Sequence, residues 1–175
     1  VSGAVLAAAR AATPPSPVVD TGNAPFTEGP WLFSLNGYVV GHAGPVGEQL
    51  RRAVSPARGR GIQGTADAEV LFALLLDRLD DGAEPADALL DLVASVVHAG
   101  SAKLNLLLSD GQQVLATTWG NSLFTLADAG LAEGGVLVAS EPLDDHPAWS
   151  PVPDGSLVEA SGIAVKLSPL LSEED

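Results

Sequence analysis

The 175-residue chain has the composition of a globular protein, because 46% of its residues are hydrophobic and only 17% are charged. Its formal net charge of −14 and pI near 4.3 disfavour nucleic acids and anionic membranes as partners, since binding to either needs a dense cationic face. No stretch approaches the roughly 18 uncharged apolar residues of a membrane span. With no cysteine, the chain has no disulfide framework, and a cytoplasmic location is expected.

The first third of the chain predicts short elements joined by turns. Residues 1–13 are typical of a buried strand that ends at a proline-rich turn. Two β-prone runs, 30–35 and 38–41, flank Asn36-Gly37, and Asn-Gly between such runs is a strong signal for a hairpin turn. Helical spacing of apolar residues over 44–54 then predicts a short helix, which an irregular glycine-rich connection follows.

Two antiparallel helices are predicted between residues 65 and 100. The first begins either with Thr65 as its N-cap or with Asp67 in its first turn, where the helix dipole favours a carboxylate. Apolar residues at helical spacing give this helix a wide buried face. The second starts at Pro85 and ends at Gly100, as residue preferences at helix termini indicate. The loop between them is short, so the two helices are expected to pack side by side.

From residue 101 the apolar period changes from helical to alternating. The sequence predicts a strand–turn–strand unit over 102–119, two strands within 122–143, a Pro- and Asp-rich loop over 144–156, and a final hairpin around Ser161-Gly162. The order of strands, two helices and strands indicates an α+β fold with largely antiparallel sheets. We expect a single domain over residues 1–171 and a frayed tail at 172–175.

Most polar clusters favour a structural interpretation. The three histidines are scattered without the spacing of metal ligands, so neither a metal ion nor another cofactor is expected. There is no Gly-x-Ser-x-Gly elbow and no cysteine nucleophile. Asp144-Asp145-His146 lies in a proline-rich loop and is interpreted as a solvated turn. The basic residues of a Pro- and Gly-rich segment are interpreted as a solvated loop; they are Arg51, Arg52, Arg58 and Arg60.

Three features remain as candidates for chemistry, each with a structural alternative. Arg10 ends an apolar run, where its planar fork could grip a carboxylate or pair with a structural acid. Asn36-Gly37 could supply a side-chain amide and a backbone N–H to an oxyanion, or could be a plain turn. Asp67 could bind an ammonium group, or could only complement the dipole of its helix.

Taken together, these motifs resemble the glutamine-binding half of the class II, or N-terminal-cysteine, glutamine amidotransferase domain. "ARAAT" is similar to the Arg-x-x-Thr strand end of that family, and "GNAPF" followed by "WLFSLNG" to its Asn-x-x-Pro-Phe and Phe-x-x-Asn-Gly segments. "GTADAEVLFALLL" resembles its Thr-x-Asp-x-Glu helix start. The signatures occur in the family's order over residues 5–76. The resemblance implies an αββα sandwich of the N-terminal-nucleophile hydrolase type, with two stacked, mostly antiparallel sheets between helices.

The resemblance also implies a role for each matching residue. Arg10, with the help of Thr13, would bind the α-carboxylate of a γ-glutamyl group, and Asp67 would hold its α-ammonium. The side-chain amide of Asn36 and the N–H of Gly37 would stabilise the oxyanion that forms at the γ-carbonyl. The expected partner is therefore a small-molecule γ-glutamyl substrate.

Departures from the common pattern narrow the choice within the family. The usual His before Asn-Gly is Leu35 here, and the usual His-Gly after the Thr is Pro14-Pro15. The last third of the chain resembles the stand-alone hydrolases, a branch that includes glutathione-degrading amidase-like proteins and γ-glutamyl-hercynylcysteine S-oxide hydrolases. "FTEGPWLFSLNG" and "SEPLDD" are most similar to the latter. This implies hydrolysis of a γ-glutamyl amide in ergothioneine biosynthesis, with release of glutamate.

The nucleophile of this family is an N-terminal Cys whose own α-amine acts as the general base. The chain contains no Cys and no Met, and the resemblance implies about 60 further residues before Val1, within the usual size of one domain. The expectation is therefore that a preceding segment carries the Cys. Three alternatives stay open: an amidase of glutathione or of another γ-glutamyl compound, a catalytically dead module that only binds γ-glutamyl groups, and a glutaminase-type amidotransferase subunit.

Overall fold

The computed structural model describes residues 4–8, 23–128 and 134–171. The predicted tail at 172–175 and most of the strand predicted over 1–13 lie outside these ranges. Residues 4–8 have no regular secondary structure, and the Val5 side chain is 84% exposed, so the predicted buried strand is wrong where the structure describes it. An apolar run becomes a strand only when a neighbour supplies the ladder of hydrogen bonds, and residues 4–8 join neither sheet of the described chain.

The predicted helices are confirmed with small shifts of their ends. The described residues form α1 (Pro45–Ala53), α2 (Pro56–Gly59), α3 (Asp67–Asp80) and α4 (Pro85–Ala99). Of the two predicted starts of α3, the one with Asp67 in the first turn is confirmed, and the one with Thr65 as N-cap is wrong, because Ala66 occupies that position. The sequence missed α2, a single turn whose cap is the Ser55 side chain. None of the helices in the described ranges is long and apolar enough to cross a membrane.

The strands of the described chain form two antiparallel sheets. The larger sheet contains, in spatial order, β1 (Phe26–Glu28), β2 (Trp31–Val39), β3 (Ala102–Ser109), β4 (Val114–Thr117), β8 (Ser156–Ser161) and β9 (Ala164–Pro169). The smaller sheet contains β6 (Gly135–Ala139), β5 (Phe124–Asp128) and β7 (Trp149–Pro151). These sheets confirm the predicted α+β class. The three-residue β7 lies in the segment predicted to be a loop.

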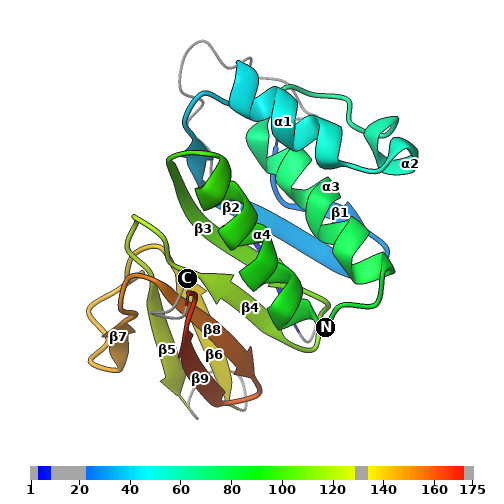
Figure 1. The fold of residues 1–175 in the computed structure, drawn as a ribbon. Coiled ribbons are helices and arrows are strands. Elements are labelled where there is room, and N and C mark those ends of the chain that lie inside the picture. Colours follow the sequence, from blue (N-terminus) through cyan, green and yellow to red (C-terminus); the bar gives the residue numbers. More distant parts are fainter. Residues whose placement is uncertain (1–3, 9–22, 129–133, 172–175) are drawn as a thin grey trace.

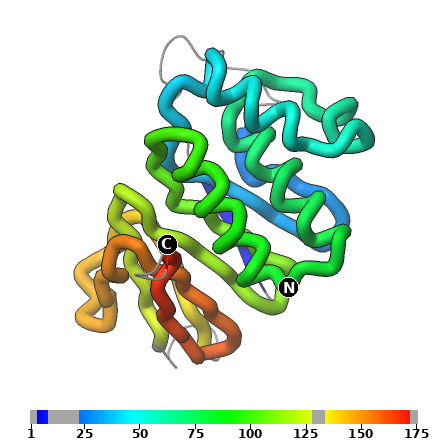
Figure 2. The backbone as a smooth tube through the Cα atoms, viewed as in Figure 1, coloured from blue at the N-terminus to red at the C-terminus, as the bar shows by residue number. Residues whose placement is uncertain are grey.

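Successive side chains of a strand point to opposite faces of its sheet. The two faces of the larger sheet therefore border two different hydrophobic cores. Leu104, Leu106 and Leu108 of β3 face the helices and belong to the main core. Leu107 faces the other way and packs in a second core with Ala116 and with residues of the smaller sheet. Figures 1 and 2 show α3 and α4 side by side on the larger sheet, where α3 contacts β2 and α4 contacts β3 and β4. The described residues thus form a helix layer on one sheet, with a second sheet behind it.

The hairpin predicted at Asn36-Gly37 is wrong, because β2 runs unbroken through both residues. The turn lies earlier, at Gly29-Pro30, where Gly29 has a φ of +57° and Glu28 pairs with Trp31. Asn-Gly favours a turn through local preferences alone. Here β2 pairs with β3 from residue 32 to residue 39, and that long-range ladder outweighs the local preference.

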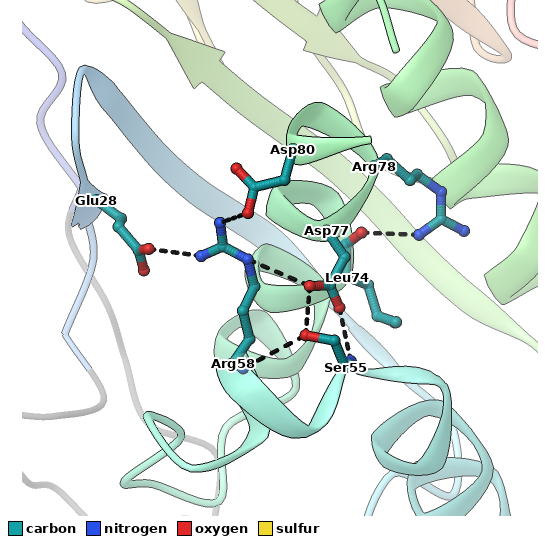
Figure 3. A network of polar contacts seen from close by, with 7 residues as sticks. All are labelled: Glu28, Ser55, Arg58, Leu74, Asp77, Arg78 and Asp80. Atoms are coloured by element: carbon teal, nitrogen blue, oxygen red, sulfur yellow. Dashed lines mark hydrogen bonds and ion pairs between the residues drawn. The ribbon is translucent and has the colours of Figure 1, made fainter. Parts of the chain in front are cut away.

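Arg58, predicted to be in a solvated loop, instead fastens α2 to α3 and β1 (Figure 3). Its side chain is 14% exposed and forms ion pairs with Glu28 at 2.5 Å, with Asp77 at 3.3 Å and with Asp80. Asp77 also accepts hydrogen bonds from the N–H and the hydroxyl of Ser55, both at 2.7 Å. Burial disfavours the guanidinium charge, but the hydrogen bonds and attraction of Glu28 and Asp80 raise the pKa of Arg58 above its ordinary value.

Candidate active site

The two candidate oxyanion donors lie near the C-terminal end of β2. Asn36 pairs with Asn105 of β3, and Gly37 pairs with Leu104. The Asn36 residue is exposed, and its side-chain amide makes no hydrogen bond to any other residue of the described chain. Within that part of the protein the amide is therefore available to a bound carbonyl oxygen.

Glycine is required at position 37 by the close approach of β2 to β3. The Gly37 φ is +157°, and a Cβ built there would lie 2.0 Å from the carbonyl oxygen of Lys103 and 2.6 Å from its carbonyl carbon. Both neighbours are backbone atoms, so no side-chain rotation can relieve the overlap. A residue without a Cβ is what allows the strand to pass this point.

Asp67 is the first residue of α3, and its carboxylate reaches β2. Its Oδ2 accepts a hydrogen bond from the Val39 N–H at 2.9 Å, and its Oδ1 accepts one from the Ala68 N–H at 2.9 Å. An ionised carboxylate offers about four acceptor sites, so about two remain for a ligand cation. The residue is partly exposed, which leaves its carboxylate open to a ligand.

The position of Asp67 identifies the edge of β2 at which the site is formed. Successive N–H groups of a strand point to opposite edges, so those of Gly37 and Val39 point to the same edge. The Val39 N–H is directed to Asp67 and not to β3. It follows that the Gly37 N–H lies on the edge of β2 that Asp67 covers, so the structure brings together Asn36-Gly37 and Asp67.

Two further side chains hold the start of α3 in this position. Glu69 accepts hydrogen bonds from the N–H groups of Gln63 at 2.6 Å and Gly64 at 2.7 Å. A ring nitrogen of His42, Nε2, lies 3.0 Å from the carbonyl oxygen of Thr65, at which distance it donates a hydrogen bond to that acceptor. The Glu69 contacts tie the segment before α3 to α3 itself, and the His42 contact ties it to the segment after β2. They give Glu69 of the predicted Thr-x-Asp-x-Glu motif a role in shaping the site.

A loop that the sequence analysis did not identify packs against the same peptide. Asn121, between β4 and β5, donates a hydrogen bond from Nδ2 to the backbone oxygen of Asn36 at 3.1 Å. The Lys103 ammonium donates to Asn121 Oδ1 at 3.2 Å. Asn121 belongs to none of the motifs, and its position depends on the register of β2 with β3. Only the structure could therefore identify it.

The predicted carboxylate-binding residues, Arg10 and Thr13, lie outside the described residues. Their contribution to the site is therefore still a prediction. No group of three or more His, Cys, Asp or Glu side chains in the described ranges is arranged to hold a metal ion.

A cavity of about 540 Å³ lies elsewhere, between β1, the α2 region and α3. Phe26, Phe72 and Arg58 are among its lining residues, and so is Glu69, whose carboxylate holds the segment before α3. Asn36, Gly37 and Asp67 do not line it. Its arginine is already paired with carboxylates from two elements. The cavity therefore does not contain the described candidate site residues, but it borders the segment that positions Asp67, through Glu69.

Sequence comparison finds curated relatives along almost the whole chain. The γ-glutamyl-hercynylcysteine sulfoxide hydrolases of Mycolicibacterium smegmatis and Mycobacterium tuberculosis are each 38% identical to it over 170 residues, or 97% of this chain. The chain spans 65% and 64% of the lengths of these two relatives. No family model matches the chain.

Solved structures with a similar fold carry related names. A glutamine aminotransferase class-II domain protein from Silicibacter pomeroyi superposes with a TM-score of 0.69 at 26% identity, covering 83% of this chain and 70% of that one. The glutamine phosphoribosylpyrophosphate amidotransferase of B. subtilis superposes with a TM-score of 0.59 at 16% identity, covering 81% of this chain and 29% of that one. The second likeness is evidence for the fold alone.

The resemblance predicted from the motifs is thus confirmed by two independent comparisons. By sequence the chain is a homologue of the γ-glutamyl-hercynylcysteine sulfoxide hydrolases, and by structure it has the α+β sandwich fold of the class II glutamine amidotransferase domains.

Proposed function

We propose that this protein, in its full-length form, hydrolyses the amide bond of a γ-glutamyl compound and releases glutamate. The contact between Asp67 and the Val39 N–H carries the proposal, because it places a carboxylate beside the strand that holds Asn36 and Gly37. Recognition of a γ-glutamyl group needs an anion for the α-ammonium, and hydrolysis needs donors for the oxyanion at the γ-carbonyl. One end of β2 offers both.

The proposed substrate is γ-glutamyl-hercynylcysteine sulfoxide, which assigns the reaction to ergothioneine biosynthesis. This choice rests on the names of the mycobacterial relatives and on their 38% identity to the chain. The free amide of glutamine and the γ-glutamyl bond of glutathione present the same head group to Asp67. Discrimination among these compounds would therefore depend on the group beyond the γ-carbonyl.

In the proposed mechanism each described residue acts on one part of the γ-glutamyl group. Asp67 binds the α-ammonium through its remaining acceptor sites. The Asn36 amide and the Gly37 N–H donate to the γ-carbonyl oxygen as it gains negative charge, an interaction that typically lowers a barrier by about 2.7–4 kcal/mol per donor. Arg10 and Thr13 would bind the α-carboxylate from the segment outside the described residues.

The proposed nucleophile is a cysteine outside these 175 residues, which contain none. Its thiolate attacks the γ-carbonyl carbon, and its own α-amine takes up the thiol proton and passes it to the departing amine as the C–N bond breaks. Water then attacks the resulting γ-glutamyl thioester and the C–S bond breaks. Glutamate leaves and the thiol is restored. An α-amine with an ordinary pKa near 8 suits this task at neutral pH.

The proposal extends to the organisation and location of the protein. Residues 1–171 belong to one domain of the glutamine amidotransferase type, and the protein acts in the cytoplasm on a small zwitterionic substrate. The net charge of −14 supports a partner of this kind over nucleic acid or an anionic membrane surface.

The test is glutamate release by the full-length protein expressed from its native gene. γ-Glutamyl-hercynylcysteine sulfoxide, glutathione and glutamine are compared as substrates, and N-terminal sequencing identifies the first residue. We expect the sulfoxide to be hydrolysed with the highest kcat/KM and the mature chain to begin with Cys. If the protein releases glutamate from none of the three compounds, the proposed function is refuted. A preference for glutathione or glutamine would refute the substrate assignment alone.

Asp67→Asn tests the ammonium site. The amide can still accept the Val39 N–H but has lost its negative charge, so kcat/KM should fall by about 10- to 150-fold, the equivalent of 1.5–3 kcal/mol for a charge-assisted hydrogen bond. Asp87→Asn is the matched control, because Asp87, like Asp67, is an acid in the first turn of its helix, α4. Equal activities for the two variants would remove Asp67 from the site.

A further inference from the structure

We infer that Asn121 is a positioning residue for the oxyanion donor Gly37, and that Lys103 holds Asn121 in the orientation this requires. The inference rests on the proposed function, because it concerns how the proposed donor is aimed. It adds two residues that contact neither the γ-glutamyl head group nor the nucleophile in the mechanism above.

The starting observation is that Asn121 donates a hydrogen bond to the peptide unit that contains the Gly37 N–H. Its Nδ2 donates to the Asn36 carbonyl oxygen at 3.1 Å. The Asn36 carbonyl and the Gly37 N–H are the two ends of one planar unit, and in a trans peptide they point in opposite directions. A side chain that fixes the direction of this oxygen therefore fixes the direction of the Gly37 N–H, toward the edge of β2 that Asp67 covers.

Lys103 determines which end of the Asn121 amide faces the peptide. An ammonium group has three donors and no acceptor, so the atom of Asn121 at 3.2 Å from Lys103 Nζ must be the oxygen Oδ1. The NH₂ group is thereby directed to the Asn36 oxygen. Lys103 also contributes the backbone carbonyl that excludes a side chain at Gly37. One residue of β3 thus constrains the donor peptide in two ways.

The loop that carries Asn121 is held by hydrogen bonds from two residues outside it, Asn105 of β3 and Asp154. Asn105 Nδ2 donates to the carbonyl oxygens of Asn121 at 3.3 Å and Ser122 at 2.8 Å, and Asn105 Oδ1 accepts the Trp119 N–H at 3.1 Å. The N–H of the following residue, Gly120, donates to the Asp154 carboxylate at 2.8 Å. Asn105 is itself buried, so this anchor is shielded from water. A loop fastened in this way can orient a peptide instead of merely contacting it.

The arrangement has a chemical consequence as well as a geometric one. A peptide whose carbonyl oxygen accepts an additional hydrogen bond becomes more polarised, and its N–H becomes a better donor, by roughly 10–30% per bond in condensed-phase estimates. The nearby ammonium of Lys103 polarises the Asn121 amide in the same sense. The chain Lys103–Asn121–Asn36 carbonyl–Gly37 N–H therefore ends at the oxygen that gains charge in the transition state.

Asn121→Asp in the full-length protein is the most direct test. The change is isosteric and keeps a partner for Lys103, so the loop should stay folded, but it removes the donor to the Asn36 oxygen. We expect kcat to fall by about tenfold with KM for the γ-glutamyl substrate nearly unchanged. The loss is smaller than the roughly 10²- to 10³-fold cost of deleting an oxyanion donor. Gln112→Ala is the control, because it removes an exposed amide from the β3–β4 turn.

A second readout does not depend on activity. In protein labelled with ¹⁵N-glycine, the amide proton of Gly37 should move upfield in Asn121→Asp and in Lys103→Met, and should stay in place in Gln112→Ala. If Lys103 acts through Asn121, the double variant should lose no more activity than the more damaging single variant.

The two readouts separate the possible failures. An unchanged Gly37 amide overturns the inference whatever the activity, and so does a shifted amide with unchanged kcat in a protein that hydrolyses γ-glutamyl substrate. A rise in KM at constant kcat also overturns it, since that would mark Asn121 as a substrate-binding residue. If the Gly37 amide shifts in the variants but the wild-type protein hydrolyses none of the γ-glutamyl compounds, the proposed function is refuted. The catalytic part of the inference is refuted with it.

Discussion

Replacing Gly37 by alanine should destabilise the whole fold, because the added methyl group would overlap the backbone of the neighbouring strand. A Cβ at this position would lie 2.0 Å from the Lys103 carbonyl oxygen. The nearest separation that the two atoms can tolerate is about 3 Å, so β2 and β3 must move apart by roughly 1 Å. Their normal spacing is about 4.8 Å, and a ladder hydrogen bond stretched by that amount is effectively lost.

The expected cost follows from the contacts that this movement breaks. The residue pairs on either side of Gly37 are Asn36–Asn105 and Tyr38–Lys103. Losing their ladder bonds costs about 0.5–1.5 kcal/mol per bond, and the unfavourable φ of a non-glycine residue adds about 1–3 kcal/mol. With one ladder bond lost from each pair, the total is about 2–6 kcal/mol, a large part of the roughly 5–15 kcal/mol that stabilises a typical domain.

Urea and thermal unfolding measure this loss without reference to any activity. A cost of about 2–6 kcal/mol corresponds to a fall in Tm of about 4–24 °C for a protein of this size. Gly162→Ala is the matched control: Gly162 has a φ of +57°, but a Cβ there would meet no atom within 4 Å. The control should therefore lose only about 1–2 kcal/mol. Equal losses in the two variants would refute the argument from close approach.

Two further predictions concern charged groups outside the candidate site. Arg58→Met should lower the free energy of unfolding by about 2 kcal/mol, since it leaves carboxylates unpaired around a side chain that is only 14% exposed. Arg52→Met, whose ion pair joins side chains 77% and 66% exposed, should cost less than about 0.5 kcal/mol in the same urea titration. Burial opposes ionisation of Asp110, but hydrogen bonds from Gln113 and Gln112 lower the pKa of its carboxyl below the ordinary 3.8. The stability that Asp110 contributes is therefore present above pH 3.8 and lost as the pH falls through the lower, folded value. Asp110→Asn should be less stable than the parent at pH 7 and equally stable in strong acid; a stability difference independent of pH would contradict this.

The elements that the sequence predicted well are those encoded by local signals. The two long helices have apolar residues at helical spacing, a proline at the start of α4 and a glycine after its end, and all of these signals lie within the helices or next to them. The Asp110-Gly111 turn between β3 and β4 was likewise predicted from its own residues, and Gly111 has the positive φ of +88° that such turns require.

The elements that were predicted wrongly depend on partners far away in the sequence. Asn36-Gly37 has the local signature of a turn, but pairing with β3, some 70 residues later, keeps it extended. Arg58 lies among prolines and glycines that suggest a solvated loop, and its burial depends on carboxylates supplied by β1 and α3. Single-sequence patterns contain no information about such partners.

The candidate site shows the same division. The motifs predicted Asn36, Gly37 and Asp67; the structure places Asn36 and Gly37 near the end of β2 and joins Asp67, the first residue of α3, to that strand through the Val39 N–H. Asn121 and Lys103 were not identified, because their role arises from the β2–β3 register and from the path of the loop after β4. Residues that contact a ligand tend to occur in recognisable motifs, whereas the residues that orient them need not.

For the proposed oxyanion donor Gly37, a position within a paired strand, and not in a turn, has a physical advantage. A turn at the surface is held by few hydrogen bonds and can change its direction at low cost, but a strand residue is held by the pairs on both sides of it. Gly37 is fixed between the β3 ladder and the Asp67 carboxylate beyond Val39, and its peptide is gripped at the other end by Asn121. In the proposed mechanism, a donor held in this way would not have to reorganise when charge develops on the substrate, and such preorganisation is the main source of electrostatic catalysis. The glycine that resembled a hairpin signal is thus better explained by the close packing that a rigid donor requires.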